Sequence, residues 1–101
     1  MAGPDDNDFG FAPPPFKPDE ALVQIRRALR DLKLAERGNA YELRGKRVVE
    51  VAREGDAIAV KIARKLALTP EWDRQTVASA AAQRKLQDEV KKRLARWEQE
   101  D

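Results

Sequence analysis

The sequence of 101 residues contains no cysteine and no histidine. Their absence excludes disulfide bonds, thiol nucleophiles, an imidazole general base and zinc sites built from the usual ligands. Serine occurs once, at Ser79, with no histidine to activate it. Glycine-rich phosphate loops are missing as well, because the five glycines lie one to a turn. We therefore predict a protein that is not an enzyme and that has no cofactor and no metal site.

Long apolar runs are also missing, so we predict no segment that crosses a membrane. The N-terminus is acidic and rich in proline, whereas a signal peptide begins with basic residues followed by an apolar stretch. The lack of cysteine agrees with a reducing compartment. These features predict a cytoplasmic protein.

Charged residues make up 38% of the chain, and the formal net charge is +2. The charge is unevenly distributed, because Asp5, Asp6 and Asp8 lie among the first sixteen residues, which contain no base. The remainder has 20 basic residues against 15 acidic ones (18 minus those three), a net charge of +5. That excess is well below the density of a dedicated nucleic-acid-binding protein.

Residues 1–16 are predicted to be a disordered arm, because Pro13–Pro15 favour an extended conformation and no apolar period is present. The arm has two interpretations. It is a tail whose last aromatic residue, Phe16, packs against the domain edge. Alternatively, it is an acidic and aromatic segment, with Phe9 and Phe11, that a partner recognises or that adds as a strand to a sheet edge. Residues 17–101 are expected to form one small α+β domain.

A helix is predicted from Pro18 to the breaker Gly38-Asn39. Asp19 and Glu20 suit the positive end of such a helix. One face carries apolar residues at helical spacing, namely Ala21, Leu22, Ile25, Ala28, Leu29 and Leu32.

Three strands of an antiparallel meander are predicted next, at residues 40–43, 47–52 and 57–63. A tight turn centred on Glu54-Gly55 would place Val51 opposite Ile58. A three-residue loop at 44–46 would place Tyr41 opposite Val49. This arrangement gives one apolar face for helices to cover and an open face that includes Val48. The expected core face is Tyr41, Leu43, Val49, Val51, Ile58, Val60 and Ile62.

A second helix is predicted from Pro70 to the chain end, with Thr69 as its cap. About 28 residues of helix are roughly 42 Å long, whereas a domain of this size is only about 30 Å across. We therefore expect the helix to overhang its own domain. Its apolar end either packs along the first helix, with Trp97 as a closing core residue, or meets another chain. The second alternative predicts a partner interface, to which the arm would add aromatic residues; the candidates are Val90, Leu94, Trp97, Phe9 and Phe11.

The basic residues offer an alternative function, because such side chains bind phosphates through contacts that weaken as salt rises. The candidates lie in the first turn of the meander and on the last helix, and they are Arg44, Lys46, Arg47, Arg84, Lys85 and Lys92. Acidic residues are interspersed among those on the last helix. For example, Asp88 precedes Lys92 by four residues, which is typical of a solvated helix surface.

The predicted order of one helix, three antiparallel strands and a second helix resembles that of the double-stranded RNA-binding domain over residues 18 to about 98. That family reads RNA by shape and places basic residues at the start of its second helix. Here the corresponding residues, Pro70-Glu71-Trp72-Asp73-Arg74, are on balance acidic, so no binding residue is carried over.

The sequence thus predicts a small non-enzymatic protein-interaction module, with a homodimer through the C-terminal helix as one form of it. The alternative is a nucleic-acid-binding module that contacts phosphates.

Overall fold

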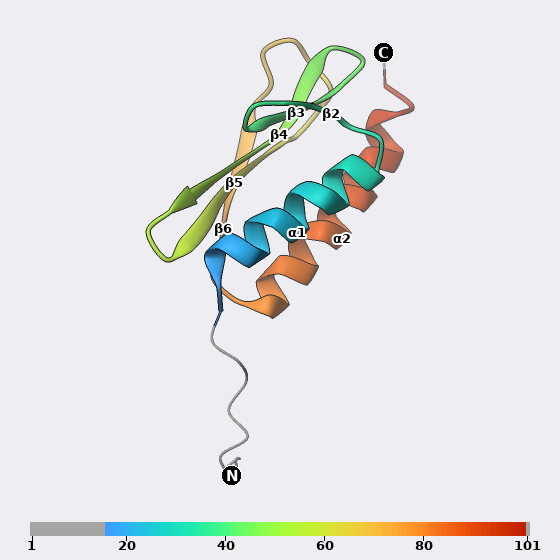
Figure 1. Cartoon of the computed structure of the whole chain (residues 1–101). Coiled ribbons are helices and arrows are strands. Elements are labelled where there is room, and N and C mark those ends of the chain that lie inside the picture. The colour runs from blue at the N-terminus through green and yellow to red at the C-terminus, as the bar shows by residue number, and fades with distance from the viewer. Residues whose placement is uncertain (1–15, 101) are drawn as a thin grey trace, which may run out of the picture.

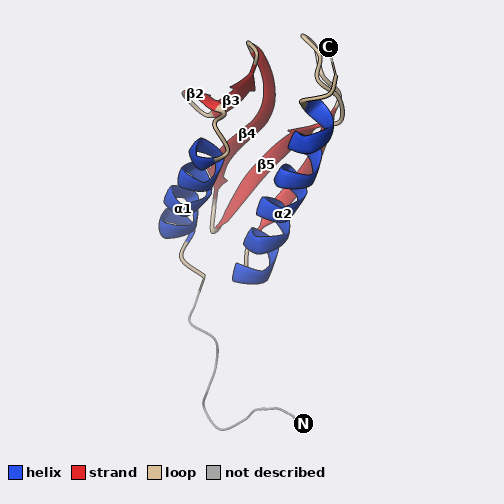
Figure 2. Ribbon diagram, turned by 90° about the vertical axis from the view of Figure 1, so that its right-hand side faces the viewer, coloured by secondary structure: helices blue, strands red, loops and turns tan. Residues whose placement is uncertain are grey.

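The structure is a computed structural model that describes residues 16–100. Two helices cover the same face of a five-stranded antiparallel sheet (Figure 1; Figure 2). The strands lie side by side in chain order, and the elements are α1 (Pro18–Asp31), β2 (Ala35–Arg37), β3 (Ala40–Leu43), β4 (Lys46–Glu54), β5 (Ala57–Ala63), β6 (Trp72–Val77) and α2 (Ala80–Trp97). The α+β class is confirmed, but the prediction of three strands is wrong. Because β2 and β6 are additional edge strands, the order of the elements no longer resembles that of the double-stranded RNA-binding domain.

The core lies between the sheet and the two helices, with α1 against β4 and β5 and α2 against β6. Six of the seven predicted core-face residues are at most 1% exposed, namely Tyr41, Val49, Val51, Ile58, Val60 and Ile62. Leu43 is half-buried and packs against this cluster. The period of two in the central strands therefore identified the covered face correctly. Neither helix among residues 16–100 has the length and apolar character needed to cross a bilayer.

The first helix ends at Asp31, seven residues before the predicted breaker at Gly38. Lys33 takes the left-handed conformation, with φ of 68°. Its N–H donates to the carbonyl of Arg30 at 2.8 Å, and the N–H of Leu34 donates to that of Leu29 at 3.4 Å. These two bonds are the Schellman motif, which usually has glycine where Lys33 stands. The prediction was wrong because it required a glycine for this conformation.

Strand β2 forms because the chain turns back at Gly38, whose φ is 61°. Arg26 of α1 holds this hairpin, donating to the Gly38 carbonyl at 3.1 Å and to Oδ1 of Asn39 at 2.7 Å. The hydroxyl of Tyr41 donates to Glu36 at 2.5 Å, and this bond, with the neighbouring arginines, holds the pKa of Glu36 below its usual value. Burial, and then Glu36 itself, raise the pKa of Tyr41. The first hairpin is therefore attached to α1 by polar contacts.

The hairpin between β3 and β4 closes with a two-residue turn, because Arg44 and Gly45 have successive φ values of 56° and 79°. The predicted three-residue loop is wrong. A bulge opposite the Tyr41/Glu42 step restores the predicted pairing of Tyr41 with Val49. The extra residue of the bulge is Val48, which is fully buried and does not lie on the open face as predicted.

The hairpin between β4 and β5 turns at Gly55-Asp56, one residue later than predicted. Val51 therefore pairs with Val60 and not with Ile58. Because side chains alternate with a period of two, this shift of two residues between β4 and β5 moves no side chain to the other face of the sheet.

The predicted helix over residues 70–97 is wrong in its first third. Residues 72–77 form β6, and α2 begins at Ala80, where the hydroxyl of Ser79 accepts from the N–H of Ala82 at 3.1 Å. At 18 residues α2 is about 27 Å long. That length matches the sheet, so the helix does not overhang its own domain.

The strained end of α1 makes a testable prediction. Lys33→Gly should raise the free energy of unfolding by about 1 kcal/mol, because glycine adopts the left-handed conformation without the penalty of a Cβ atom. Lys33→Ala is the matched control and should lie within about 0.5 kcal/mol of the parent, because alanine keeps the Cβ. Urea denaturation of the three proteins measures the difference. A glycine variant no more stable than the alanine variant would contradict this account.

Candidate interaction edge

Strand β6 forms one edge of the sheet. It pairs with β5 through six consecutive residue pairs, from Ile58↔Val77 to Ala63↔Trp72, without a bulge. Its other side is paired with no strand among residues 16–100. An edge of this kind carries backbone donors and acceptors that can pair with another extended chain.

The loop after β5 shows which backbone groups of β6 point away from the sheet. The N–H of Arg64 donates to the carbonyl of Glu71 at 3.0 Å, and these residues are opposite each other in the same register. Opposed antiparallel residues alternate between pairs that exchange hydrogen bonds and pairs that do not. The residues that bond to β5 are therefore Asp73, Gln75 and Val77. The N–H and C=O groups that face outward belong to Trp72, Arg74 and Thr76.

The opposite edge, β2, has only three residues, and Arg37 on its outer end pairs with Glu42 at 3.2 Å. Glu36 in its centre is held by Arg26 and by the Tyr41 hydroxyl. Short and charged edges discourage pairing with another chain. β6, at six residues, is the longer and more regular edge.

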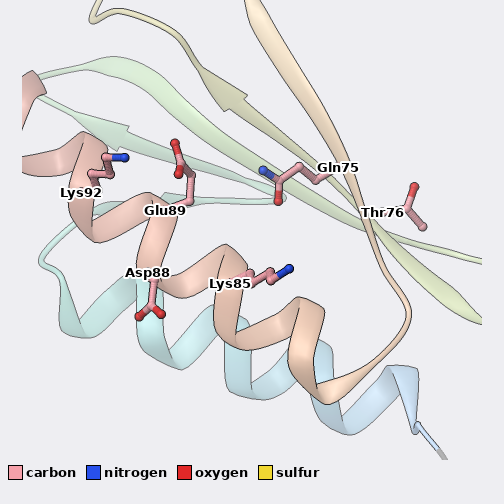
Figure 3. A pocket seen from close by; sticks show the side chains of 6 residues that line it. All are labelled: Gln75, Thr76, Lys85, Asp88, Glu89 and Lys92. Atoms are coloured by element: carbon pink, nitrogen blue, oxygen red, sulfur yellow. The ribbon is translucent and has the colours of Figure 1, made fainter.

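An open groove runs between β6 and α2 (Figure 3). It is lined by Gln75, Thr76, Lys85, Asp88, Glu89 and Lys92. The side chains of Gln75 and Lys85 point toward each other across the groove, whereas that of Asp88 points away from β6. Thr76 lies on the far side of the strand, on the open face of the sheet, as the register requires. An extended chain beside β6 would thus have α2 on one side and open sheet on the other.

Two acidic groups next to this edge, Asp73 and Glu89, are neutralised by arginines within the protein. The carboxylate of Asp73 is 2.8 Å from Nε of Arg64 and 2.8 Å from a guanidinium nitrogen of Arg93. Arg64 and then Arg93 hold the pKa of Asp73 below its usual value, and Asp73 in turn raises the pKa of Arg64. Arg93 also pairs with Glu89 at 2.6 Å and donates to the carbonyl of Ala63 at 3.2 Å. This network attaches α2 to the sheet.

Four other basic groups next to the edge form no ion pair among the described residues. Lys85 and Lys92 flank the groove, and Lys61 and Arg74 lie opposite each other on the open face. Asp88 is the acid of the groove that forms no ion pair among the described residues. The bases without an ion pair outnumber it, so the net charge of the unpaired groups around β6 is positive. This surplus favours an acidic ligand.

The structure places the predicted interface residues of the last helix in the core. Val90 and Trp97 are 0% exposed, and Leu94 is half-buried against the same cluster. Their side chains thus pack within the chain, and Nε1 of Trp97 has no hydrogen-bond partner among the described residues. Phe9 and Phe11 lie outside the described residues.

The six predicted phosphate-contacting residues are not brought together. Arg44 donates to the carbonyls of Glu98 and Glu100 at 2.9 Å each and so caps the end of α2. Arg47 pairs with Glu50 at 3.3 Å on the open face. Arg84 and Lys85 lie near the start of α2, and from Arg84 to Glu98 the helix rises about 21 Å. Lys92 lies between these ends, and Lys46 forms no ion pair among residues 16–100.

Sequence reasoning did not find the β6 edge, because Trp72 and Thr76 also fit a helical stripe that continues into α2. Two signals were present. Thr76 and Val77 are adjacent β-branched residues, which favour a strand, and Ser79 is as good a helix cap as Thr69.

Comparisons of the chain with protein-family models, with curated protein sequences and with solved structures gave no match. Function is therefore argued from the residues of this chain alone. Among residues 16–100, no group of three or more acidic side chains is arranged to hold a metal ion.

The alternation along β6 makes a testable prediction. Gln75→Pro should lower the free energy of unfolding by about 2 kcal/mol or more, because it removes an N–H that bonds to β5 and leaves a carbonyl of β5 without its donor. Thr76→Pro should stay within about 1 kcal/mol of the parent, since proline is tolerated where the N–H faces outward from an edge strand. Urea denaturation compares the two neighbouring variants. The reverse order would show that the outward-facing residues are assigned wrongly.

Proposed function

We propose that this protein is a non-enzymatic interaction module that binds an extended segment of a partner protein along β6. The observation that carries the proposal is the outward orientation of the Arg74 and Thr76 backbone groups on a regular edge strand beside an open groove. Strand addition of this kind obtains affinity from backbone hydrogen bonds and specificity from the neighbouring side chains.

The chemistry of the side chains supports a binding function over catalysis. The chain has neither histidine nor cysteine. Glu36 and Asp73, the described carboxyl groups with a resolved pKa shift, both have lowered pKa values. A general acid at neutral pH requires a raised pKa, so both shifts are in the wrong direction for that role.

The edge itself supports strand addition. β6 contains neither proline nor a bulge, two devices by which proteins protect edges. A third protective device is a charged side chain that points inward from the edge strand. Asp73 points toward the helix layer in this way, but its charge is neutralised by Arg64 and Arg93. On the open face, an incoming strand would lie beside the side chains of Trp72, Arg74 and Thr76 of β6.

Selection of peptides from a random displayed library against the full chain tests this proposal. Peptides that bind along β6 should lose affinity by about tenfold or more for Thr76→Pro, which removes an outward N–H and places a ring on the edge. Val23→Ala, on the exposed face of α1, is the matched control and should leave affinity unchanged. Selected peptides that bind Thr76→Pro as tightly as the parent would refute binding along this edge.

A second candidate function rests on the charge of α2. This helix carries six basic residues against Asp88 and Glu89, a net charge of +4. Four of the bases (Arg84, Lys85, Lys91 and Lys92) form no ion pair among the described residues. Such a surface favours contacts with the phosphates of a nucleic acid.

Binding to a mixed-sequence duplex at two salt concentrations tests the second candidate. Phosphate contacts predict measurable affinity at about 20 mM salt that falls at least tenfold by 150 mM. Lys85→Ala/Lys92→Ala should reduce the salt dependence, because two phosphate contacts are removed. Lys46→Ala/Arg47→Ala is the matched control at the far turn. Undetectable binding at low salt would eliminate this function.

A further inference from the structure

The arm that precedes α1 has a chemistry that complements the β6 edge. Residues 5–11 read Asp-Asp-Asn-Asp-Phe-Gly-Phe, with three acids, no base and no proline. Prolines bound the segment at Pro4 and Pro13. Seven residues free of proline are enough to pair along a six-residue edge strand.

The unpaired charges around β6 have the opposite sign. Lys85 and Lys92 lie on the α2 side, and Lys61 and Arg74 lie on the open-face side, all without an ion pair among the described residues. The acids next to the edge, Asp73 and Glu89, are already paired with arginines. Asp88 is the acid of the groove without an ion pair, and its side chain points away from β6 (Figure 3), so the bases that face the edge favour acidic side chains on either side.

α1 begins at the end of the sheet where β6 finishes (Figure 1). Nε2 of Gln83 donates to Oε1 of Gln24 at 2.8 Å, which ties the first turns of α2 to α1. α2 itself begins only three residues after Val77. A linker of residues 12–16 can reach at most roughly 16 Å at about 3.1 Å per residue, so it keeps residues 5–11 near the end of the sheet at which α1 begins.

We infer that residues 5–11 add to β6 of the same chain as a parallel strand, an inference that rests on the proposed function of this edge. The direction would be parallel, because β6 runs toward the end of the sheet at which α1 begins and the short linker of residues 12–16 would hold the C-terminal end of the segment at that same end. With side chains alternating, Asp6 and Asp8 share one face and Phe9 and Phe11 share the other. Asp6 and Asp8 face Lys85 and Lys92 in the groove, and the two phenylalanines cover the open face beside Thr76.

This arrangement makes the arm a built-in competitor for the partner segment. A short linker gives an attached segment an effective concentration in the millimolar range. A partner must therefore displace the arm, and the edge is covered until it does. A covered edge also resists pairing between copies.

Amide hydrogen exchange, measured by NMR on the full chain of residues 1–101, tests the inference at single residues. The amides of Arg74 and Thr76 face outward, so they are protected only when another strand pairs with them. Those of Gln75 and Val77 bond to β5 in either case and are internal controls. We expect protection of Arg74 and Thr76 of at least about tenfold over unprotected rates.

Changes in the arm supply matched controls. Asp6→Asn/Asp8→Asn should lower the protection of Arg74 and Thr76 severalfold, because both charges that face the lysines are lost. Asp5→Asn, on the other face, should lower it much less. Gln75 and Val77 should keep their protection in every variant.

Three results would overturn the inference. Arg74 and Thr76 would exchange at unprotected rates in the full chain. The two arm variants would have equal effects. Alternatively, protection would rise with protein concentration together with a dimer mass in sedimentation, which would place the arm on a second copy. Selected peptides that still protect Arg74 and Thr76 would leave the proposed function intact, whereas peptides that protect neither would refute that function as well.

Discussion

The carboxylate of Asp73 lies between the guanidinium groups of Arg64 and Arg93, and the arrangement of the edge depends on this contact. A carboxylate that points from an edge strand toward the helix layer would be unfavourable there without a cationic partner. Arg93 provides one and at the same time binds Glu89 and the carbonyl of Ala63. One guanidinium thus joins α2, β5 and β6, and the groove lies beside this junction.

Helix α2 has two roles, because one side packs in the core and the other side carries basic residues on the surface. Its inner side supplies Val90 and Trp97 to the core, where both are fully buried. Its outer side carries the bases that remain available to a ligand. An amphipathic helix of 18 residues can meet both requirements because its faces are independent. The basic surface is therefore presented by an element that packing holds rigid, as a binding site requires.

Prediction from the sequence succeeded in the central strands, where the apolar residues follow a single period of two. The alternation in residues 47–63 identified the covered face, and it survived an error of two residues in register because the side-chain period is two. It failed where two interpretations shared the same residues. Trp72 and Thr76 fit both a helical stripe and a strand, so β6, and with it the candidate edge, was missed. The end of α1 was missed because Lys33 adopts a conformation usually left to glycine.

The sequence by itself determined the α+β class, the apolar face of the meander, the absence of histidine and cysteine chemistry, and the acidic character of the arm. These properties follow from residue type and local spacing, which need no knowledge of distant contacts. Only the tertiary structure decided that Trp97 belongs to the core, that Arg44 caps α2, and that residues 72–77 extend the sheet. Each of those outcomes depends on residues far apart in the chain, since burial and ion pairing are settled by which segments meet and not by the segments alone.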